Sequence, residues 1–442
     1  EDKAVRSYVK RWMIIAAVVM VIAVVVTVPV SIKLSQVDPT ESPTETPSLS
    51  PSTAPSSDRT AQIFTFLSGV TEFDVFSDRE SPQYRAAIWM SLEDKLSLGL
   101  DEPNFLQRYA LATFYFSTSG DDWRTCSRGD GNCVKRPNGS PGAKHAFLSG
   151  FTECEWWGTF CDDSGMVTDI RPPGMGDKPG NYLDGTLPRE LSLITSMTQL
   201  SLPSSSFKVF PEWIGDLTSL ETLILYKDEM EGTIPESLYS LVNLTELRLN
   251  RNSLGGTIST RIGNLVNMKD RFNVGGNKLY GAIPTEIGKL TNLVDLYLYD
   301  NLLTFTIPET MFNMTSIEEI DFNTNLLSGT VPPNFAKLDS LEELFLNKND
   351  FTGVIPDAMG SMTNLEILNI EENDITKISE SVCDLVDLVN LEITADVLCD
   401  SKTPSLSPST APSKTRSLSP SIAFSKTPSL LPSTAPSTVV SP

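Results

Sequence analysis

The sequence has 442 residues, of which 34 are Lys or Arg and 56 are Asp or Glu, so the formal net charge is −22. Such an acidic balance argues against a basic face for phosphates, and we expect no nucleic-acid partner. The single histidine, His145, weakens mechanisms that need a histidine pair, a histidine-rich metal site or a Ser-His-Asp triad. We therefore predict a protein that is not an enzyme and that holds no cofactor and no metal.

A run without any charged side chain, residues 12–32, lies near the N-terminus between Arg11 and Lys33. About 20 apolar residues span a bilayer core, and this run lacks the polar face of a core helix. We predict a transmembrane helix that acts as an uncleaved anchor, with a cleaved signal peptide and a buried core helix as the alternatives. Because more basic residues precede the span than follow it, the positive-inside rule predicts a type II protein with residues 1–11 in the cytosol.

Two segments rich in Pro, Ser and Thr flank the rest of the chain, a spacer at 33–60 and a tail at 401–442. Prolines recur every four residues in both, and the decapeptide PSLSPSTAPS occurs at 47–56 and again at 404–413. Such segments have little apolar mass and few backbone donors, so we expect disordered, extended spacers open to O-glycosylation. A ligand for a proline-binding module is the alternative interpretation.

Residues 61–166 are expected to form a helical N-terminal cap that carries cysteines. Ser81 followed by Pro82 is a helix start signal, and a second helix is expected to begin near Asp101 and to end at Gly120. The six cysteines fall by spacing into three local pairs, a usage that suits an oxidising compartment, and the disulfide connectivity stays open. The pairs are Cys126 and Cys133, Cys154 and Cys161, and Cys383 and Cys399.

The segment 167–400 consists of repeats of 23–25 residues that share the pattern LxxLxLxxNxLxGxIPxxLxxLxx, after a first strand at 167–170. In each unit LxLxx predicts a short strand with two inward leucines. The recurring asparagine lies at the following bend, where its amide can bond to the backbone and stack into a ladder. One unit cannot bury its own core, so the units must stack between terminal caps. The nine units start at Met197, Leu220, Leu244, Met268, Leu293, Ile317, Leu341, Leu365 and Leu388.

These units resemble the plant-type leucine-rich repeat, whose hallmark is Gly-x-Ile-Pro, and the resemblance covers residues 154–398. The motif from Cys154 through Trp156 and Gly158 to Cys161 is similar to the N-terminal cap of plant receptors and inhibitors of this family. The full layout resembles single-pass leucine-rich-repeat membrane proteins of diatom-type algae. The resemblance implies an α/β fold, a curved right-handed solenoid (a horseshoe) that binds ligands on its concave or lateral face. Unlike the plant receptor kinases, this chain has its predicted anchor before the repeats and contains no kinase motif.

Outward strand positions supply the candidate ligand site. Adjacent strands lie ~4.8 Å apart, so aromatic side chains at these positions are expected to form a band near the middle of the concave face, with two arginines beside it. Exposed aromatics and arginines are the usual anchors of recognition surfaces. The alternative is that these are scattered exposed aromatics of the kind found on any protein. The candidate residues are Tyr226, Arg248, Arg251, Tyr297, Tyr299 and Phe345.

An acidic strip runs through the same repeats and could bind Ca²⁺ or a cationic partner. A solvated face on an acidic protein is the simpler interpretation, and no EF-hand spacing supports a calcium site. The strip consists of Asp295, Glu318, Glu319, Asp321, Glu342, Glu343 and Glu366. Three sequons, at Asn138, Asn243 and Asn313, are predicted glycosylation sites of an extracellular domain.

Taken together, the sequence predicts a receptor-like recognition protein on the cell surface. Its partners would be the membrane, an extracellular protein, peptide or glycan ligand, and a co-receptor, because only about eleven residues would lie in the cytosol. The alternative is a structural or adhesive glycoprotein of a cell wall or matrix, held there by its two Pro-rich segments.

Overall fold

A computed structural model describes residues 57–124, 126–128, 145–172, 183–389, 391–397 and 399. The predicted anchor at 12–32, the tail at 401–442 and all but the last four residues of the spacer at 33–60 lie outside these ranges. Within the described ranges, no helix combines the length and the apolar character needed to cross a bilayer.

Helices occupy much of the described part of residues 61–166. The hydroxyl of Ser81 accepts a hydrogen bond from the backbone N–H of Tyr84 at 3.1 Å, and α3 begins at the next residue. The following helix, α4, begins at Phe105 rather than near Asp101, because Pro103 disfavours helical backbone at the residue before it. The helical elements of the cap are α2 (Ser57–Leu67), η1 (Phe73–Ser77), α3 (Pro82–Leu92), α4 (Phe105–Ser117), η2 (Gly120–Asp122) and η3 (Glu153–Glu155).

A fully buried arginine organises this cap. The guanidinium of Arg108 on α4 makes two hydrogen bonds to the carboxylate of Asp94, at 2.8 and 2.6 Å, and lies 3.6 Å from the carboxylate of Glu153. The same guanidinium lies over the rings of Trp156 and Trp89, 4.7 and 5.1 Å from their centroids. The guanidinium also donates to the backbone carbonyls of Phe151 and Ser149, so the buried charges of the cap are paired and hydrogen-bonded.

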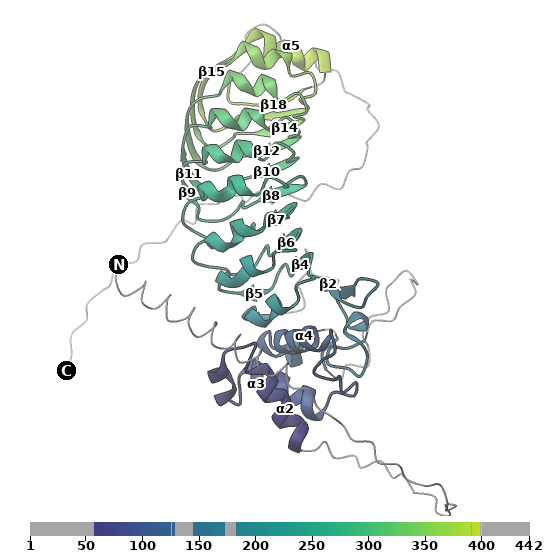
Figure 1. The fold of residues 1–442 in the computed structure, drawn as a ribbon. Coiled ribbons are helices and arrows are strands. Elements are labelled where there is room, and N and C mark those ends of the chain that lie inside the picture. Colours follow the sequence, from purple (N-terminus) through teal and green to yellow (C-terminus); the bar gives the residue numbers. More distant parts are fainter. Residues whose placement is uncertain are drawn as a thin grey trace, which may run out of the picture. The chain divides into compact units, whose positions relative to one another are not determined.

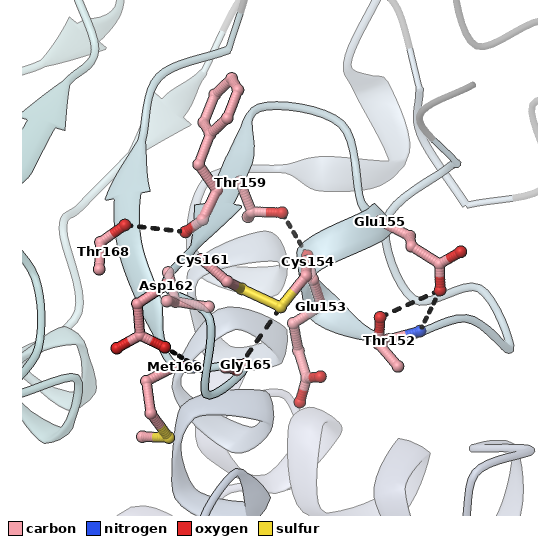
Figure 2. The surroundings of a disulfide bond; sticks show 12 residues. Thr152, Glu153, Cys154, Glu155, Thr159, Cys161, Asp162, Gly165, Met166 and Thr168 are labelled. Atoms are coloured by element: carbon pink, nitrogen blue, oxygen red, sulfur yellow. Dashed lines mark hydrogen bonds between the residues drawn. A yellow bond between two sulfur atoms is a disulfide. The ribbon is translucent and has the colours of Figure 1, made fainter. Parts of the chain in front are cut away.

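Disulfide bonds lie at both ends of the repeats. Cys154 and Cys161 are joined beside η3, where Thr152 and Glu155 cap one another (Figure 2). Cys383 and Cys399 form a second bond in the C-terminal cap. Both are local pairs expected from spacing. Cys126 is also disulfide-bonded, whereas Cys133 lies outside the described residues.

The repeats build an eleven-stranded sheet, here called the main sheet, in which one short strand comes from each coil (Figure 1). Neighbouring strands pair in parallel except for β1 and β2, which are antiparallel. The strand β2 occupies the predicted range, whereas β1 lacks the repeat pattern and was not predicted. The strands are β1 (Thr159–Cys161), β2 (Val167–Ile170), β4 (Gln199–Ser201), β6 (Thr222–Ile224), β7 (Glu246–Arg248), β8 (Arg271–Asn273), β10 (Asp295–Tyr297), β12 (Glu319–Asp321), β14 (Glu343–Phe345), β16 (Ile367–Asn369) and β18 (Glu392–Thr394).

A second parallel sheet of five strands, here called the side sheet, lies along the opposite edge of the coils (Figure 1). The sequence pattern did not predict it. Its strands are β9 (Tyr280–Gly281), β11 (Leu302–Phe305), β13 (Leu326–Thr330), β15 (Asp350–Ile355) and β17 (Asp374–Ile378), and a separate pair consists of β3 (Asp184–Gly185) and β5 (Ser206–Phe207). The coils return through short 3₁₀ helices η4 (Arg189–Leu193), η5 (Glu212–Asp216), η6 (Glu236–Ser240), η7 (Thr260–Asn264), η8 (Thr285–Lys289), η9 (Glu309–Asn313), η10 (Pro333–Lys337) and η11 (Asp357–Ser361).

The predicted asparagine ladder is present between the two sheets. In one rung the side-chain amide of Asn301 donates to the carbonyls of Leu298 and Val274, both at 3.1 Å, and its oxygen accepts from the N–H of Leu279 at 2.9 Å. Each rung therefore satisfies backbone groups of its own coil and of the coil before it. Equivalent rungs are formed by Asn252, Asn277, Asn325, Asn349 and Asn373.

The last unit departs from its predicted register. Leu388, the predicted start of that unit, lies instead on α5 (Glu380–Val389), where its side chain is 72% exposed. In β18 it is Ile393 that pairs with Leu368, so the strand runs two residues later than the repeat pattern indicates. The amphipathic helix α5 takes the place of the usual 3₁₀ segment and lengthens the connection.

Candidate recognition surface

Each repeat strand of the main sheet directs its middle side chain into the core and its two flanking side chains outward. In β10, for example, Leu296 is buried between Asp295 and Tyr297. The register then aligns equivalent positions of successive coils into two outward rows. One row contains Arg271, Asp295, Glu319 and Glu343, and the other contains Arg248, Asn273, Tyr297, Asp321 and Phe345.

Tyr297 is not the exposed aromatic that the sequence predicted, because only 9% of it is accessible. Its hydroxyl is hydrogen-bonded to the carboxylate of Glu319 on the next strand. The guanidinium of Arg271 on the preceding strand lies 5.0 Å from the ring centroid. Tyr297 is therefore covered on the surface side and supports the site rather than presenting a free ring.

Arg271 is the residue that sequence reasoning missed. Its Nε donates a hydrogen bond of 2.8 Å to Asp295. Burial lowers the pKa of the guanidinium, but the nearby Tyr297 and Asp295 more than offset this effect, so the pKa is raised. Its position in the strand register could have identified it. Arg271 lies directly beside Asp295, and the aromatic Tyr297 is on the same strand as Asp295. Arginine beside a carboxylate and over a ring combines an ion pair with a cation–π contact.

Tyr299 is half-buried and lies across the neighbouring coil. A Cβ atom on Gly275 would come within 2.4 Å of its ring, so the ring occupies the space that this glycine leaves open. Its hydroxyl lies 3.5 Å from the side-chain amide nitrogen of Asn250, two coils away, and its ring is 6.5 Å from that of Tyr297. Gly275 was not singled out from the sequence, although it replaces the larger residues at this position of other coils.

The predicted aromatics do not form one continuous band. Tyr226 and Tyr299 hold equivalent positions on coils three apart, which places them ~14 Å apart. Asp321 separates Tyr297 from Phe345 in the outward row. Tyr226 and Phe345 are half-buried on the surface, at opposite ends of the predicted set.

The two predicted arginines are in different situations. Arg248 is half-buried and pairs with Glu246 of its own strand at 2.5 Å. Arg251 is exposed and follows the strand with a positive φ of 60°. Arg251 is thus the more accessible of the two, whereas Arg248 already has a carboxylate partner.

Carboxylates outnumber cations toward the C-terminal half of this surface. Asp295, Glu319 and Glu343 lie side by side on three strands, and Arg271 neutralises only the first. Burial raises the pKa of Glu319, and burial followed by the nearby Glu319 raises the pKa of Glu343. Burial also raises the pKa of Asp321, to about 6, although Asn323 hydrogen-bonds its carboxylate. A cationic ligand would relieve this crowding.

Two of the three predicted glycosylation sites lie within the described residues. Asn243 and Asn313 have exposed side chains, and Asn138 lies outside the described residues. In the part of the chain that the structure describes, no three His, Cys, Asp or Glu side chains are grouped as metal ligands.

Family models for the leucine-rich repeat match residues 243–265, 291–351 and 339–398. The chain contains leucine-rich repeats. The repeats inferred from the sequence are thereby confirmed over the matched residues. No curated protein sequence matches the chain significantly.

Among solved structures, the plant peptide hormone receptor RGFR1 in complex with RGF2 is 30% identical over 48% of this leucine-rich-repeat chain, with a TM-score of 0.46. The Arabidopsis receptor kinase HAESA in complex with the peptide hormone IDA and the co-receptor SERK1 is 28% identical over 51% of the chain, with a TM-score of 0.42. A plant ice-binding protein is 26% identical over 52% of the chain, with a TM-score of 0.42. The matched region spans 33% of RGFR1, 41% of HAESA and 80% of the ice-binding protein.

Proposed function

We propose that this protein is a membrane-anchored, receptor-like recognition protein whose leucine-rich repeats bind an extracellular protein, peptide or glycan. The observation that carries the proposal is the outer face of the main sheet, where the half-buried ring of Tyr299 lies against Gly275 beside the cluster of Arg271, Asp295 and Tyr297. Rigid strands fix these side chains before any ligand arrives, which lowers the entropic cost of binding.

The charges on this face favour a ligand with cationic groups. Of three adjacent carboxylates only Asp295 forms an ion pair with an arginine, and the side chain of Glu343 has no basic partner among the described residues. Arginine or lysine side chains of a peptide or a protein segment would pair with Glu343 and Asp321, while Tyr299 and Phe345 would supply apolar contact. The revised set of contact residues is therefore Tyr299, Phe345, Asp321 and Glu343, with Tyr297 in a supporting role.

The proposal also includes the orientation of the chain in the membrane. The uncharged run at 12–32 would anchor the chain with its N-terminus in the cytosol, and the repeats would lie outside the cell, where disulfides persist and sequons such as Asn243 and Asn313 are glycosylated. The proposed activity is binding without catalysis. A co-receptor is the proposed partner that would carry a signal across the membrane.

The test is a binding screen of the full chain, purified in detergent, against arrays of peptides graded in charge and of cell-wall glycans. We expect saturable binding that is strongest for basic peptides and that falls as salt rises. A folded chain that binds nothing on either array, and that is extracted from cells only with the wall fraction, would replace this proposal with the structural or adhesive glycoprotein.

A further inference from the structure

One residue of the side sheet has a backbone conformation that its side chain disfavours. Phe305 ends β11 with a φ of 68°. At the equivalent position five other coils have glycine, namely Gly232, Gly256, Gly281, Gly329 and Gly353, with φ between 82° and 87°. A bulky residue in the left-handed region is strained, and such strain persists where the side chain has a use.

The neighbouring coil makes room for this phenylalanine. A Cβ atom on Gly329 would lie 2.9 Å from the methyl carbon of Thr306, and one on Gly353 would lie 3.2 Å from that of Thr330. In each case the threonine lies 23 residues earlier in the chain, and the residue 23 positions before Phe305 is Ala282, which lacks that methyl group. Phe305 is 64% exposed, so burial in the core does not account for the strained residue.

Phe305 adjoins an exposed apolar face on the side sheet. Leu302 and Tyr280 are register partners on β11 and β9, and Leu326 lies on β13 next to Thr304. All three large apolar side chains are exposed. Exposed apolar faces of this kind mark interaction sites.

Opposite charges border this face at its two ends. Lys278, Leu302, Leu326 and Asp350 each directly follow a ladder asparagine, so they hold equivalent positions on four consecutive coils. Lys278 and Asp350 are exposed, and neither forms an ion pair within the described ranges of the chain. Along this row the side chains are a cation, two apolar groups and an anion. The row is therefore neutral, although the net charge of the chain is −22.

We propose that this face binds a second copy of the same chain. A two-fold axis through the midpoint between Leu302 and Leu326 places each leucine against the other leucine of the second copy. The same axis places Lys278 against Asp350 of the second copy, twice per dimer. An isologous interface requires self-complementarity of this kind. Phe305, at the rim, extends the apolar contact. This pairing does not depend on the ligand site of the main sheet.

The test is sedimentation of the full chain in density-matched detergent, with a charge swap across the proposed contact. We expect the wild type to be a dimer, and Lys278→Asp or Asp350→Lys alone to weaken dimerisation by about tenfold or more. The double variant Lys278→Asp/Asp350→Lys restores the opposite charges and should dimerise within about threefold of the wild type. Lys289→Asp, the same charge change on η8, is the matched control and should have no effect.

Three results would overturn the proposal. One is a wild-type chain that stays monomeric. The second is a dimer that none of the swaps alters, since it would then form through another segment. The third is a double variant that is no better than the single ones, because the two side chains would then not face one another. Circular dichroism of each variant shows that the fold is retained.

Discussion

At the scale of single residues, one rung of the ladder carries an acidic side chain. Asp228 holds the position of the ladder asparagine in its coil, and one of its oxygens accepts from the N–H of Ser205 at 2.6 Å. Its other oxygen is buried and has no hydrogen-bond partner among the described residues. The side-chain amide of asparagine donates hydrogen bonds to carbonyl groups, whereas an ionised carboxylate has no hydrogen to donate. Burial accordingly raises the pKa of Asp228 to about 8.

We predict that Asp228→Asn stabilises the protein in a pH-dependent way. Because the folded-state pKa is above the unfolded value of 3.8, the protonated rung is fully stabilising below pH 4 and this contribution is lost as pH rises toward 8. The gain from the variant should be near zero at pH 4 and about 1–3 kcal/mol at pH 8, the usual cost of an unsatisfied buried polar group. Urea denaturation at both pH values measures it, with Asn252→Asp as the converse control. An equal gain at both pH values would contradict a protonated rung.

At the scale of the elements, the side sheet stores strain at Phe305. We predict that Phe305→Gly raises the free energy of unfolding of the monomer by up to ~1 kcal/mol, because relief of the left-handed strain exceeds the entropy cost of glycine. Gly329→Ala is the matched control and should destabilise, since its Cβ would lie 2.9 Å from the methyl carbon of Thr306 at a φ of 87°. Thermal unfolding at dilute, monomeric concentration gives both signs. If Phe305→Gly destabilises instead, the residue is there for packing.

The strands also show which parts of the fold the repeat pattern predicts and which it does not. Main-sheet strands and ladder rungs were predictable because leucine and asparagine recur at fixed spacing. The side sheet was not, because its outward positions vary from Leu302 to Asp350 and β-pairing there follows from the stacking of coils. In the candidate site, the rows were predictable from the repeat, whereas the burial of Tyr297 depends on Arg271, a residue of another coil that no local pattern links to it.

At the scale of the whole molecule, the N-terminal cap closes the stack of coils. The side chain of Gln107 on α4 accepts a hydrogen bond from the N–H of Val167 at 2.9 Å, and Ser117 donates to the carbonyl of Thr186 at 2.9 Å. Thr71 also donates to Glu190 of the first coil at 2.7 Å. Repeat arrays are held by nearest-neighbour interfaces, so the first coil depends on this cap.

We predict that Arg108→Met destabilises the cap by about 3–5 kcal/mol, because it leaves Asp94 and Glu153 buried without a cation. Hydrogen exchange should then show loss of protection in the cap and in β2, with smaller changes toward β16. Arg189→Met removes an exposed ion pair with Asp216 and should cost under about 1 kcal/mol. Equal effects of the two variants would show that the buried cluster is not what holds the cap.

The most direct test of the proposed recognition site compares three forms of the full chain. The measurement is the affinity of each form for a ligand identified in the binding screen. The wild type and Phe305→Gly should bind equally, because Phe305 lies on the side sheet. Tyr299→Ala should bind about tenfold or more weakly, as expected for a central aromatic anchor of the main-sheet surface. Unchanged binding by a folded Tyr299→Ala chain, together with loss of binding in Phe305→Gly, would place recognition on the side sheet and contradict the proposed site.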